Sequence, residues 1–139
     1  MSDAQFDVVV FGATSFVGQI LCQYLTDTYG VNGELKWAAA GRSKDKLEKV
    51  RAQLGAAGSE LPLLTADAND DASLDTLCAQ TRVVVSTVGP YALYGEPMIR
   101  ACVSSGTDYC DLTGEVQWIA AMLEEYEDQA KQSGARIVH

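Results

Sequence analysis

Residues 12–18 combine glycines and a serine at a spacing that could bind a phosphate group. The segment Gly12–Gly18 follows Phe6–Phe11, an apolar run typical of a buried strand, and glycines after a strand let the backbone turn tightly into a helix. Backbone N–H groups in such a turn point at one spot at the positive end of the helix dipole, where an anion is stabilised. Ser15 stands where the dinucleotide-binding pattern G-x-G-x-x-G has its middle glycine, so the match to that pattern is incomplete. The residues expected to form this site are Gly12, Thr14, Ser15, Phe16, Val17 and Gly18.

A second pair of candidate residues follows the next apolar segment, Glu34–Gly41. A site for NAD usually has Asp or Glu about 20 residues past the glycines to accept hydrogen bonds from the ribose hydroxyls, and there is none at the end of this segment. Arg42 instead has a guanidinium group that can donate two parallel hydrogen bonds to a 2′-phosphate, and the neutral hydroxyl of Ser43 lies beside it in the sequence. This pair favours NADP over NAD as the cofactor. The alternative is that Arg42 is a solvated loop residue and that Ser43 only caps the following helix.

Two later segments supply further candidate residues. Asp67 could accept a hydrogen bond from an adenine amino group while Ala68 lines the ring; alternatively, Asp67 and Asn69 only cap the next helix. The segment 87–90 is expected to pass over the nicotinamide ribose, because its glycine allows close approach of the backbone and its proline fixes the turn. Its residues are Thr87, Val88, Gly89 and Pro90.

The remaining candidates have open roles. Tyr91 and Tyr94 either close the pocket or pack on the surface. Asp111 and Glu115 could touch a substrate, but we favour a role in capping a helix start. His139, the only histidine, is the last residue, so no Ser-His-Asp or Cys-His arrangement is expected. No tyrosine is followed by lysine four residues later, as in short-chain dehydrogenases, and no G-K-S/T follows the glycines, so no catalytic acid or base is evident.

The elements that would position these residues alternate along the chain. Strands are expected at 6–11, 34–41, 61–66, 82–88, 107–112 and 136–139, and helices at 16–29, 44–54, 71–80, 95–104 and 115–133. This alternation predicts an α/β fold with right-handed βαβ units and a doubly wound parallel sheet, the Rossmann arrangement of strand order 3-2-1-4-5-6 with its sixth strand truncated. In such a sheet ligands lie across the carboxyl ends of the strands, where the candidate residues fall.

Composition narrows the class of protein further. The 139 residues predict one domain, 1–139, and no apolar run approaches the roughly 20 residues needed to span a bilayer. The N-terminus lacks the basic segment of a signal peptide. A net charge of −9 argues against binding to nucleic acid, DNA included, or to anionic membranes. Four cysteines without C-x-x-C spacing indicate core residues of a cytoplasmic protein, with neither disulfides nor a metal site.

Five segments together resemble the N-terminal cofactor-binding part of saccharopine-dehydrogenase-like oxidoreductases, a group that includes the mycobacterial trans-acting enoyl reductases. The matching segments are 12–18, 40–43, 87–91, 106–115 and 134–139. The resemblance implies an NAD(P)-dependent oxidoreductase with a much longer chain, of which these residues are a fragment that ends before a substrate and dimerisation domain. It implies a small-molecule substrate held by that missing domain and a possible homodimer of the full-length protein.

We therefore predict the cofactor-binding domain of an NADP-dependent oxidoreductase, which transfers hydride between the nicotinamide and a substrate bound elsewhere. The fragment alone is expected to be inactive. One alternative is a non-catalytic dinucleotide-sensing domain, because no acid/base pair is visible in the sequence. Another is a structural domain whose glycine turn binds nothing.

Overall fold

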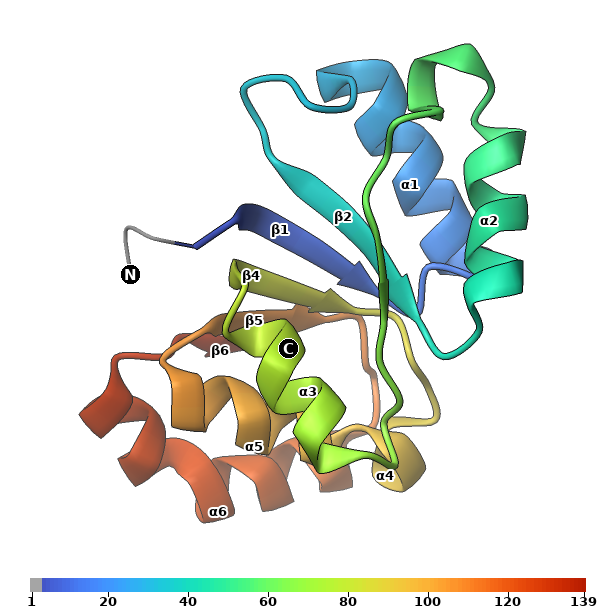
Figure 1. Cartoon of the computed structure of the whole chain (residues 1–139). Coiled ribbons are helices and arrows are strands. Elements are labelled where there is room, and N and C mark those ends of the chain that lie inside the picture. Colours follow the sequence, from blue (N-terminus) through green and yellow to red (C-terminus); the bar gives the residue numbers. More distant parts are fainter. Residues whose placement is uncertain (1–3) are drawn as a thin grey trace.

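Six parallel strands form one sheet in the order β3-β2-β1-β4-β5-β6 in the computed structural model, which describes residues 4–139 (Figure 1). The strands are β1 (Phe6–Phe11), β2 (Trp37–Gly41), β3 (Leu63–Thr65), β4 (Thr81–Ser86), β5 (Asp108–Asp111) and β6 (Ile137–Val138). The helices are α1 (Phe16–Tyr29), α2 (Lys44–Gln53), α3 (Asp71–Cys78), α4 (Tyr91–Tyr94), α5 (Glu96–Ser105) and α6 (Val116–Ser133), with a 3₁₀ turn at Ala56–Gly58. The predicted doubly wound fold, its strand order and its short last strand are confirmed.

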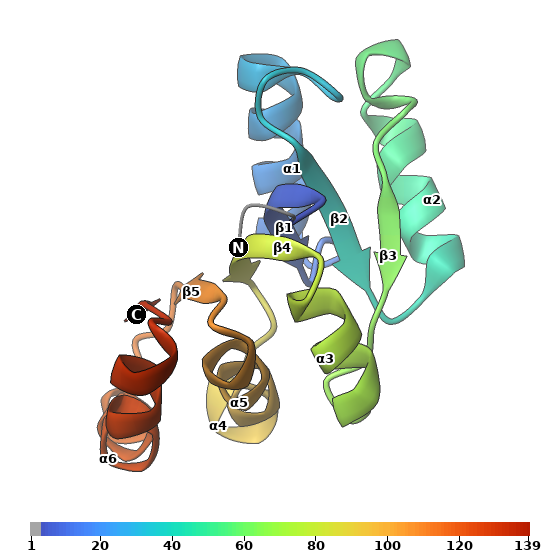
Figure 2. The ribbon, with the colours of Figure 1, turned by 60° about the vertical axis from the view of Figure 1, so that its left-hand side comes forward.

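Both faces of the sheet are covered, which explains the continuous apolar runs in β1 and β4. Successive residues of a strand point to opposite faces, so Val9 packs in the core beneath α3, α5 and α6, and Val10 in the core beneath α1 and α2. Figure 2 shows the sheet between these two groups of helices. Trp118 is buried in the first of these cores and Trp37 in the second.

Several element boundaries differ from the prediction. β2 begins at Trp37 rather than Glu34, because the Lys36 N–H donates to the Asp7 carboxylate at 2.9 Å instead of joining the ladder. β4 ends at Ser86, two residues earlier than expected. The short helix α4 was not predicted, because the carboxylate that accepts from its first N–H group belongs to Glu115, 24 residues further along the chain.

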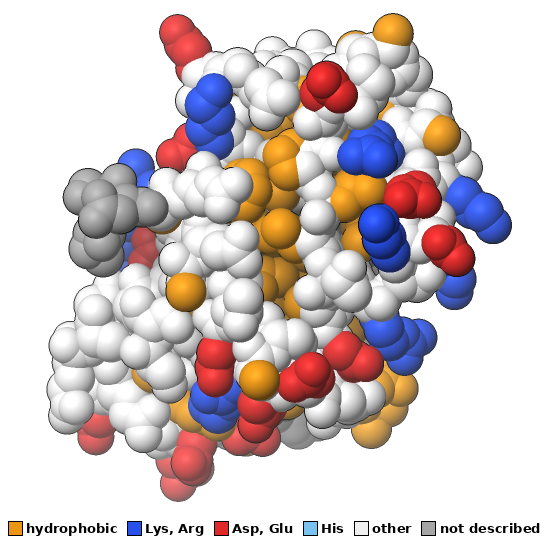
Figure 3. All heavy atoms as spheres, in the orientation of Figure 1, with side chains coloured by type: hydrophobic (Ala, Val, Ile, Leu, Met, Phe, Trp, Pro, Cys, Tyr) orange, Lys and Arg blue, Asp and Glu red, His pale blue; other side chains and the backbone are white. Residues whose placement is uncertain are grey.

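On the face in Figure 3, hydrophobic side chains gather along a central hollow, with charged side chains mostly around its margins. Cys22, Cys78 and Cys102 are buried and Cys110 is half-buried, and all four are free thiols. Within residues 4–139, no helix has the length and apolar character needed to cross a membrane.

Candidate functional site at the carboxyl ends of the strands

A cavity of about 310 Å³ lies at the carboxyl ends of the central strands. Nine of the predicted site residues line it: Gly12, Thr14, Ser15, Arg42, Asp67, Ala68, Thr87, Val88 and Gly89. The other five predicted residues, Phe16, Val17, Gly18, Ser43 and Pro90, lie outside its lining. Phe11, Gly41, Ala66 and Asn69 line the cavity without having been predicted as site residues, and so does Tyr94, whose role was left open. Most of these additions directly adjoin predicted residues in the chain, which is the signal that could have found them.

Glycine is required at both ends of the turn between β1 and α1. Gly12 has a φ of +86°, and a Cβ there would lie 2.7 Å from both Thr87 Oγ1 and Val88 Cγ2. A Cβ on Gly18 would lie 2.2 Å from the Gly12 carbonyl oxygen, which is backbone and cannot move aside. The first glycine therefore lets the turn approach β4, and the second lets α1 approach the turn.

Ser15 fixes the geometry of the turn, although it breaks the glycine pattern. Its hydroxyl accepts a hydrogen bond from the Gly18 N–H at 3.0 Å, which caps α1. The same oxygen lies 3.0 Å from Thr87 Oγ1, which in turn lies 2.8 Å from the Gly12 carbonyl oxygen. Ser15 thus links the turn to the end of β4.

The start of α1 presents backbone donors without acceptors. In residues 4–139, no hydrogen bond has the N–H of Phe16 or Val17 as its donor. What Phe16 and Val17 offer a ligand at this turn is therefore their backbone N–H groups; Phe16 as a residue is 80% exposed. Two free N–H groups at the positive end of a 14-residue helix form an arrangement that stabilises an anion.

Arg42 and Ser43 have different roles at the end of β2. Arg42 is exposed, lines the cavity, and forms no ion pair or side-chain hydrogen bond with the described part of the chain. Its guanidinium is therefore available to a ligand. The Ser43 hydroxyl accepts from the Lys46 N–H at 3.3 Å and caps α2, as its alternative interpretation proposed.

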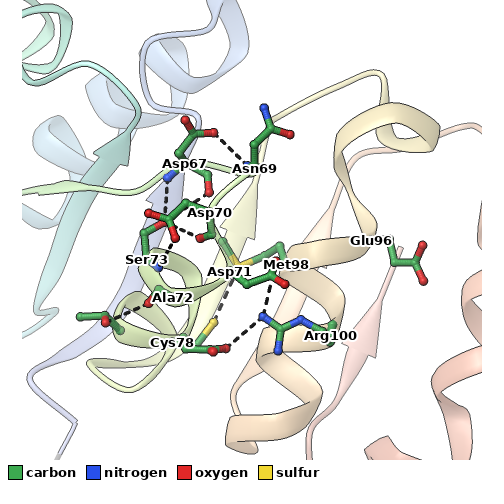
Figure 4. A network of polar contacts seen from close by, with 12 residues as sticks. Asp67, Asn69, Asp70, Asp71, Ala72, Ser73, Cys78, Glu96, Met98 and Arg100 are labelled. Atoms are coloured by element: carbon green, nitrogen blue, oxygen red, sulfur yellow. Dashed lines mark hydrogen bonds and ion pairs between the residues drawn. The ribbon is translucent and has the colours of Figure 1, made fainter.

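Asp67 lines the cavity at the end of β3 but does not cap α3. One oxygen of its carboxylate accepts from the Asn69 N–H at 2.9 Å, and its own N–H donates to the Ser73 hydroxyl at 3.0 Å (Figure 4). The cap of α3 is Asp70, whose carboxylate accepts from the Ser73 N–H at 3.4 Å. Of the two interpretations left open for Asp67, the one in which Asp67 and Asn69 cap this helix is not what the structure has, because the chain makes an extra turn before the helix and Asp70 caps it.

Glu115 caps a helix, but not the one it precedes. Its carboxylate reaches back to α4 and accepts from the Tyr91 N–H at 2.7 Å and the Ala92 N–H at 3.1 Å. Tyr91 is buried, its hydroxyl donates to the Ser86 carbonyl at 2.8 Å, and its ring packs 5.4 Å from Trp118. Burial raises the pKa of Tyr91. Of the two tyrosines with open roles, Tyr91 packs inside and Tyr94 lines the cavity.

Asp111 pairs with the only histidine, an arrangement that the sequence analysis did not predict. Asp111 Oδ2 lies 2.9 Å from His139 Nδ1 and accepts from the Tyr109 hydroxyl at 2.7 Å. The Asp111 side chain is 0% exposed and that of His139 10%. Burial, together with the hydrogen bond to Asp111, raises the pKa of Tyr109. The register of the assembled strands explains the pair: Tyr109 pairs with Ile137, so Asp111 and His139, two residues further along each strand, are neighbours.

This combination defines a nucleotide-binding domain of the doubly wound α/β class: a glycine turn and free N–H groups follow β1, at the point where the strand order reverses. Residues 8–138 match the model of the saccharopine dehydrogenase NADP-binding domain, and the chain belongs to that family. The resemblance noted from the sequence is thereby confirmed.

Relatives with assigned names are longer than this chain. A trans-acting enoyl reductase of Mycobacterium bovis (strain BCG) is 39% identical over 137 residues, which is 99% of this chain and 32% of the relative. A trans-acting enoyl reductase of Mycobacterium ulcerans is 42% identical over 140 residues, covering 99% of this chain and 33% of the relative. The chain thus spans about a third of the length of these relatives.

Solved structures share the fold at low sequence identity. Apo saccharopine dehydrogenase (L-Glu forming) from Saccharomyces cerevisiae has a TM-score of 0.69 at 19% identity, over 95% of this chain and 26% of that one. Triphenylmethane reductase of Citrobacter sp., complexed with NADP(H), has a TM-score of 0.67 at 16% identity, over 95% of this chain and 47% of that one. At these identities the likeness concerns the fold alone.

Proposed function

We propose that this chain binds NADP(H) in the cavity at the strand ends. The observation that carries the proposal is the pair of free N–H groups of Phe16 and Val17 at the start of α1, which suits the pyrophosphate. Gly12 supports it, because the absence of a side chain there keeps the turn open and close to β4. When bound, the cofactor supplies a hydride at its nicotinamide ring.

The end of β2 supports NADP rather than NAD. The residue after the strand is Arg42, whose free guanidinium lines the cavity and can bind a 2′-phosphate through two parallel hydrogen bonds. No carboxylate stands at Gly41–Ser43 to accept from a ribose 2′-hydroxyl, as an NAD site requires. The negative net charge of the chain makes this local positive group more important for a polyanionic ligand.

We further propose that the whole protein is an oxidoreductase that transfers hydride between NADP(H) and a small molecule held by residues outside this chain. The names of the relatives support an enoyl compound as the substrate. The competing hypothesis is a dinucleotide sensor without catalysis. Consumption of NADPH by the whole protein with a trans-2-enoyl thioester would exclude the sensor, whereas binding of NADPH without turnover of any enoyl or carbonyl substrate would favour it.

Calorimetry with NADPH and NADH tests the cofactor assignment. Hydrogen bonds to charged groups contribute about 1.5–3 kcal/mol, so Arg42→Ala should weaken NADPH binding by roughly ten- to a hundredfold and leave NADH binding unchanged. Lys49→Ala, which removes a positive charge from the exposed side of α2, is the matched control and should have little effect on either ligand. Equal affinities of the unmodified chain for NADPH and NADH would contradict the proposal.

A further inference from the structure

We propose that Glu115 is a positioning residue for the nicotinamide half of the cofactor, acting through α4 and the Val88–Pro90 segment. The inference rests on the proposed function, since it concerns how NADP(H) is held. Glu115 does not line the cavity itself. Its effect on the ligand must therefore pass through the backbone that its carboxylate binds.

The Glu115 carboxylate anchors a helix that could not stand alone. α4 has four residues, and an isolated helix of that length is unstable in water. Both carboxylate oxygens are used: Oε2 accepts from the Tyr91 N–H at 2.7 Å and Oε1 from the Ala92 N–H at 3.1 Å. Pro90, the residue before the helix, provides no side-chain cap, so Glu115 replaces the local cap that the sequence lacks.

The anchored segment is the one that borders the cavity. Val88 and Gly89 line the cavity and connect two fixed points, Ser86 at the end of β4 and Tyr91 at the start of α4. These points are also joined directly, because the Tyr91 hydroxyl donates to the Ser86 carbonyl at 2.8 Å. Glu115 and the Tyr91 hydroxyl together therefore determine the path of this loop.

Glu115 is itself held by a chain of hydrogen bonds from the sheet. The Glu115 N–H donates to the Thr113 hydroxyl at 3.0 Å, and the Thr113 N–H donates to Asp111 Oδ1 at 3.1 Å. The other Asp111 oxygen accepts from the hydroxyl of Tyr109, within β5, and contacts His139, the residue after β6. The loop beside the cavity is thus connected to β5 and to the end of β6, through a network that includes the Glu115 backbone N–H as well as its side chain.

The other half of the cavity is independent of this network. Arg42 and Asp67 follow β2 and β3, on the opposite side of β1 from β4 and β5, and neither is hydrogen-bonded to Glu115 or to α4. Loss of the Glu115 contacts should consequently affect a ligand that reaches Val88 and Gly89, and should not affect a ligand that occupies only the adenosine end.

Calorimetry with two ligands tests this separation. Adenosine 2′,5′-bisphosphate has only the adenosine half, whereas NADPH spans both halves. Glu115→Gln keeps the size of the side chain but removes its charge and one acceptor, and it should weaken NADPH binding roughly tenfold while the bisphosphate stays within about twofold. Glu124→Gln, on the exposed side of α6, is the matched control and should change neither affinity.

A second variant keeps the test valid if Glu115→Gln does not fold. Tyr91→Phe preserves the ring against Trp118 but removes the hydrogen bond to Ser86, and it should show the same selective loss of NADPH affinity. Equal losses for both ligands, or no loss for NADPH, would overturn the inference. A chain that binds the bisphosphate as tightly as NADPH would overturn it too, since the nicotinamide half would then add nothing to the binding free energy. If the unmodified chain binds neither ligand, the proposed function itself fails.

Discussion

Ser15 shows how one residue can break a sequence pattern and still support the same site. The glycine usual at this position leaves room for a phosphate, and serine reduces that room by one small side chain. In return its hydroxyl caps α1 and meets the Thr87 hydroxyl at 3.0 Å. The turn after β1 and the end of β4 are therefore joined by a side-chain hydrogen bond that a third glycine could not make.

Removal of the Ser15 hydroxyl should lower stability through the cap. Ser15→Ala leaves the Gly18 N–H without its acceptor and should reduce the free energy of unfolding by about 1 kcal/mol. Thr87→Val should also reduce the free energy of unfolding. The double variant should lose less stability than the sum of the two single variants, because the two hydroxyls share one hydrogen bond. Urea denaturation of the four proteins measures this. Strict additivity would show that the two hydroxyls do not interact.

Gly18→Ala should be strongly destabilising even though alanine favours helices. The new Cβ would lie 2.2 Å from the Gly12 carbonyl oxygen and 2.8 Å from Ala13 Cα, so the backbone must shift. Overpacking of this kind costs about 1–3 kcal/mol, more than the gain of up to about 1 kcal/mol from helix propensity. Gly114→Ala, where no atom lies within 4 Å of the added Cβ, is the control for chemical denaturation. Equal unfolding midpoints for the two variants would contradict the expected clash.

At the scale of elements, local patterns predicted most of the fold. The bounds of α1 follow from its helical spacing and from Gly30 at its end, and the strand order follows from the alternation of strands and helices. Caps were less predictable, since Asp67, Asn69 and Asp70 are all chemically suitable for α3 and only the path of the loop selects Asp70. The site shows the same division between features set by local sequence and features set by the folded chain: its glycine turn is local in sequence and was predicted.

Contacts between distant residues could not be predicted in the same way. α4 exists because a carboxylate 24 residues further along the chain binds its first N–H group. The pairing of Asp111 with His139, 28 residues apart, depends on the register of β5 and β6. Both interactions join residues whose own neighbours give no sign of them. Sequence patterns report local propensity, whereas these contacts follow from the assembled sheet.

The junction of β5 and β6 should make stability depend on pH in acid. Asp108 accepts hydrogen bonds from the N–H and Nε of Arg136, at 2.9 and 3.0 Å, and these bonds lower the pKa of Asp108 below 3.8. The folded state therefore favours the ionised carboxyl group. The resulting stabilisation is present at pH values above the pKa that Asp108 has in the unfolded chain, near 3.8, and it is lost as the pH falls through the lowered pKa of the folded state.

Asp108→Asn should remove this contribution. Between about pH 5 and pH 2.5, the urea midpoint of the variant should fall less steeply than that of the unmodified chain. Because Arg136 is exposed, the difference should be modest and should shrink with added salt. Asp128→Asn, on the exposed surface of α6, is the matched control. If the urea midpoint depends on pH equally steeply in Asp108→Asn and in the unmodified chain, the Asp108–Arg136 pair contributes nothing to the pH dependence of stability.

At the scale of the whole molecule, the cavity depends on both sides of the sheet. Its turn residues lead into α1, which packs in one core, and Ala66, at the end of β3, packs in the other. β1 supplies neighbouring residues to the two cores, with Val9 in one and Val10 in the other. The geometry of the site is therefore maintained only while both layers of helices stay packed on the sheet. Because β1 contributes to both cores, we expect the two cores to unfold together.

The buried cysteines can test this cooperativity, because each core contains at least one. Cys22 lies in the core under α1 and α2, where burial raises the pKa of its thiol to about 12. Cys102 lies in the other core, where the hydrogen bond to Cys78 and burial raise the pKa of its thiol. Alkylating agents react with the thiolate, so both thiols should be protected until the chain unfolds. The test uses a Cys110→Ser variant, which lacks the half-buried thiol. Short pulses of iodoacetamide are applied at increasing urea concentrations, and mass spectrometry measures the labelling of each cysteine. Cys22 and Cys102 should become labelled with the same urea midpoint. Labelling of Cys22 at distinctly lower urea would show that the α1 and α2 layer opens first, and that the turn between β1 and α1 can be lost while the rest of the sheet stays folded.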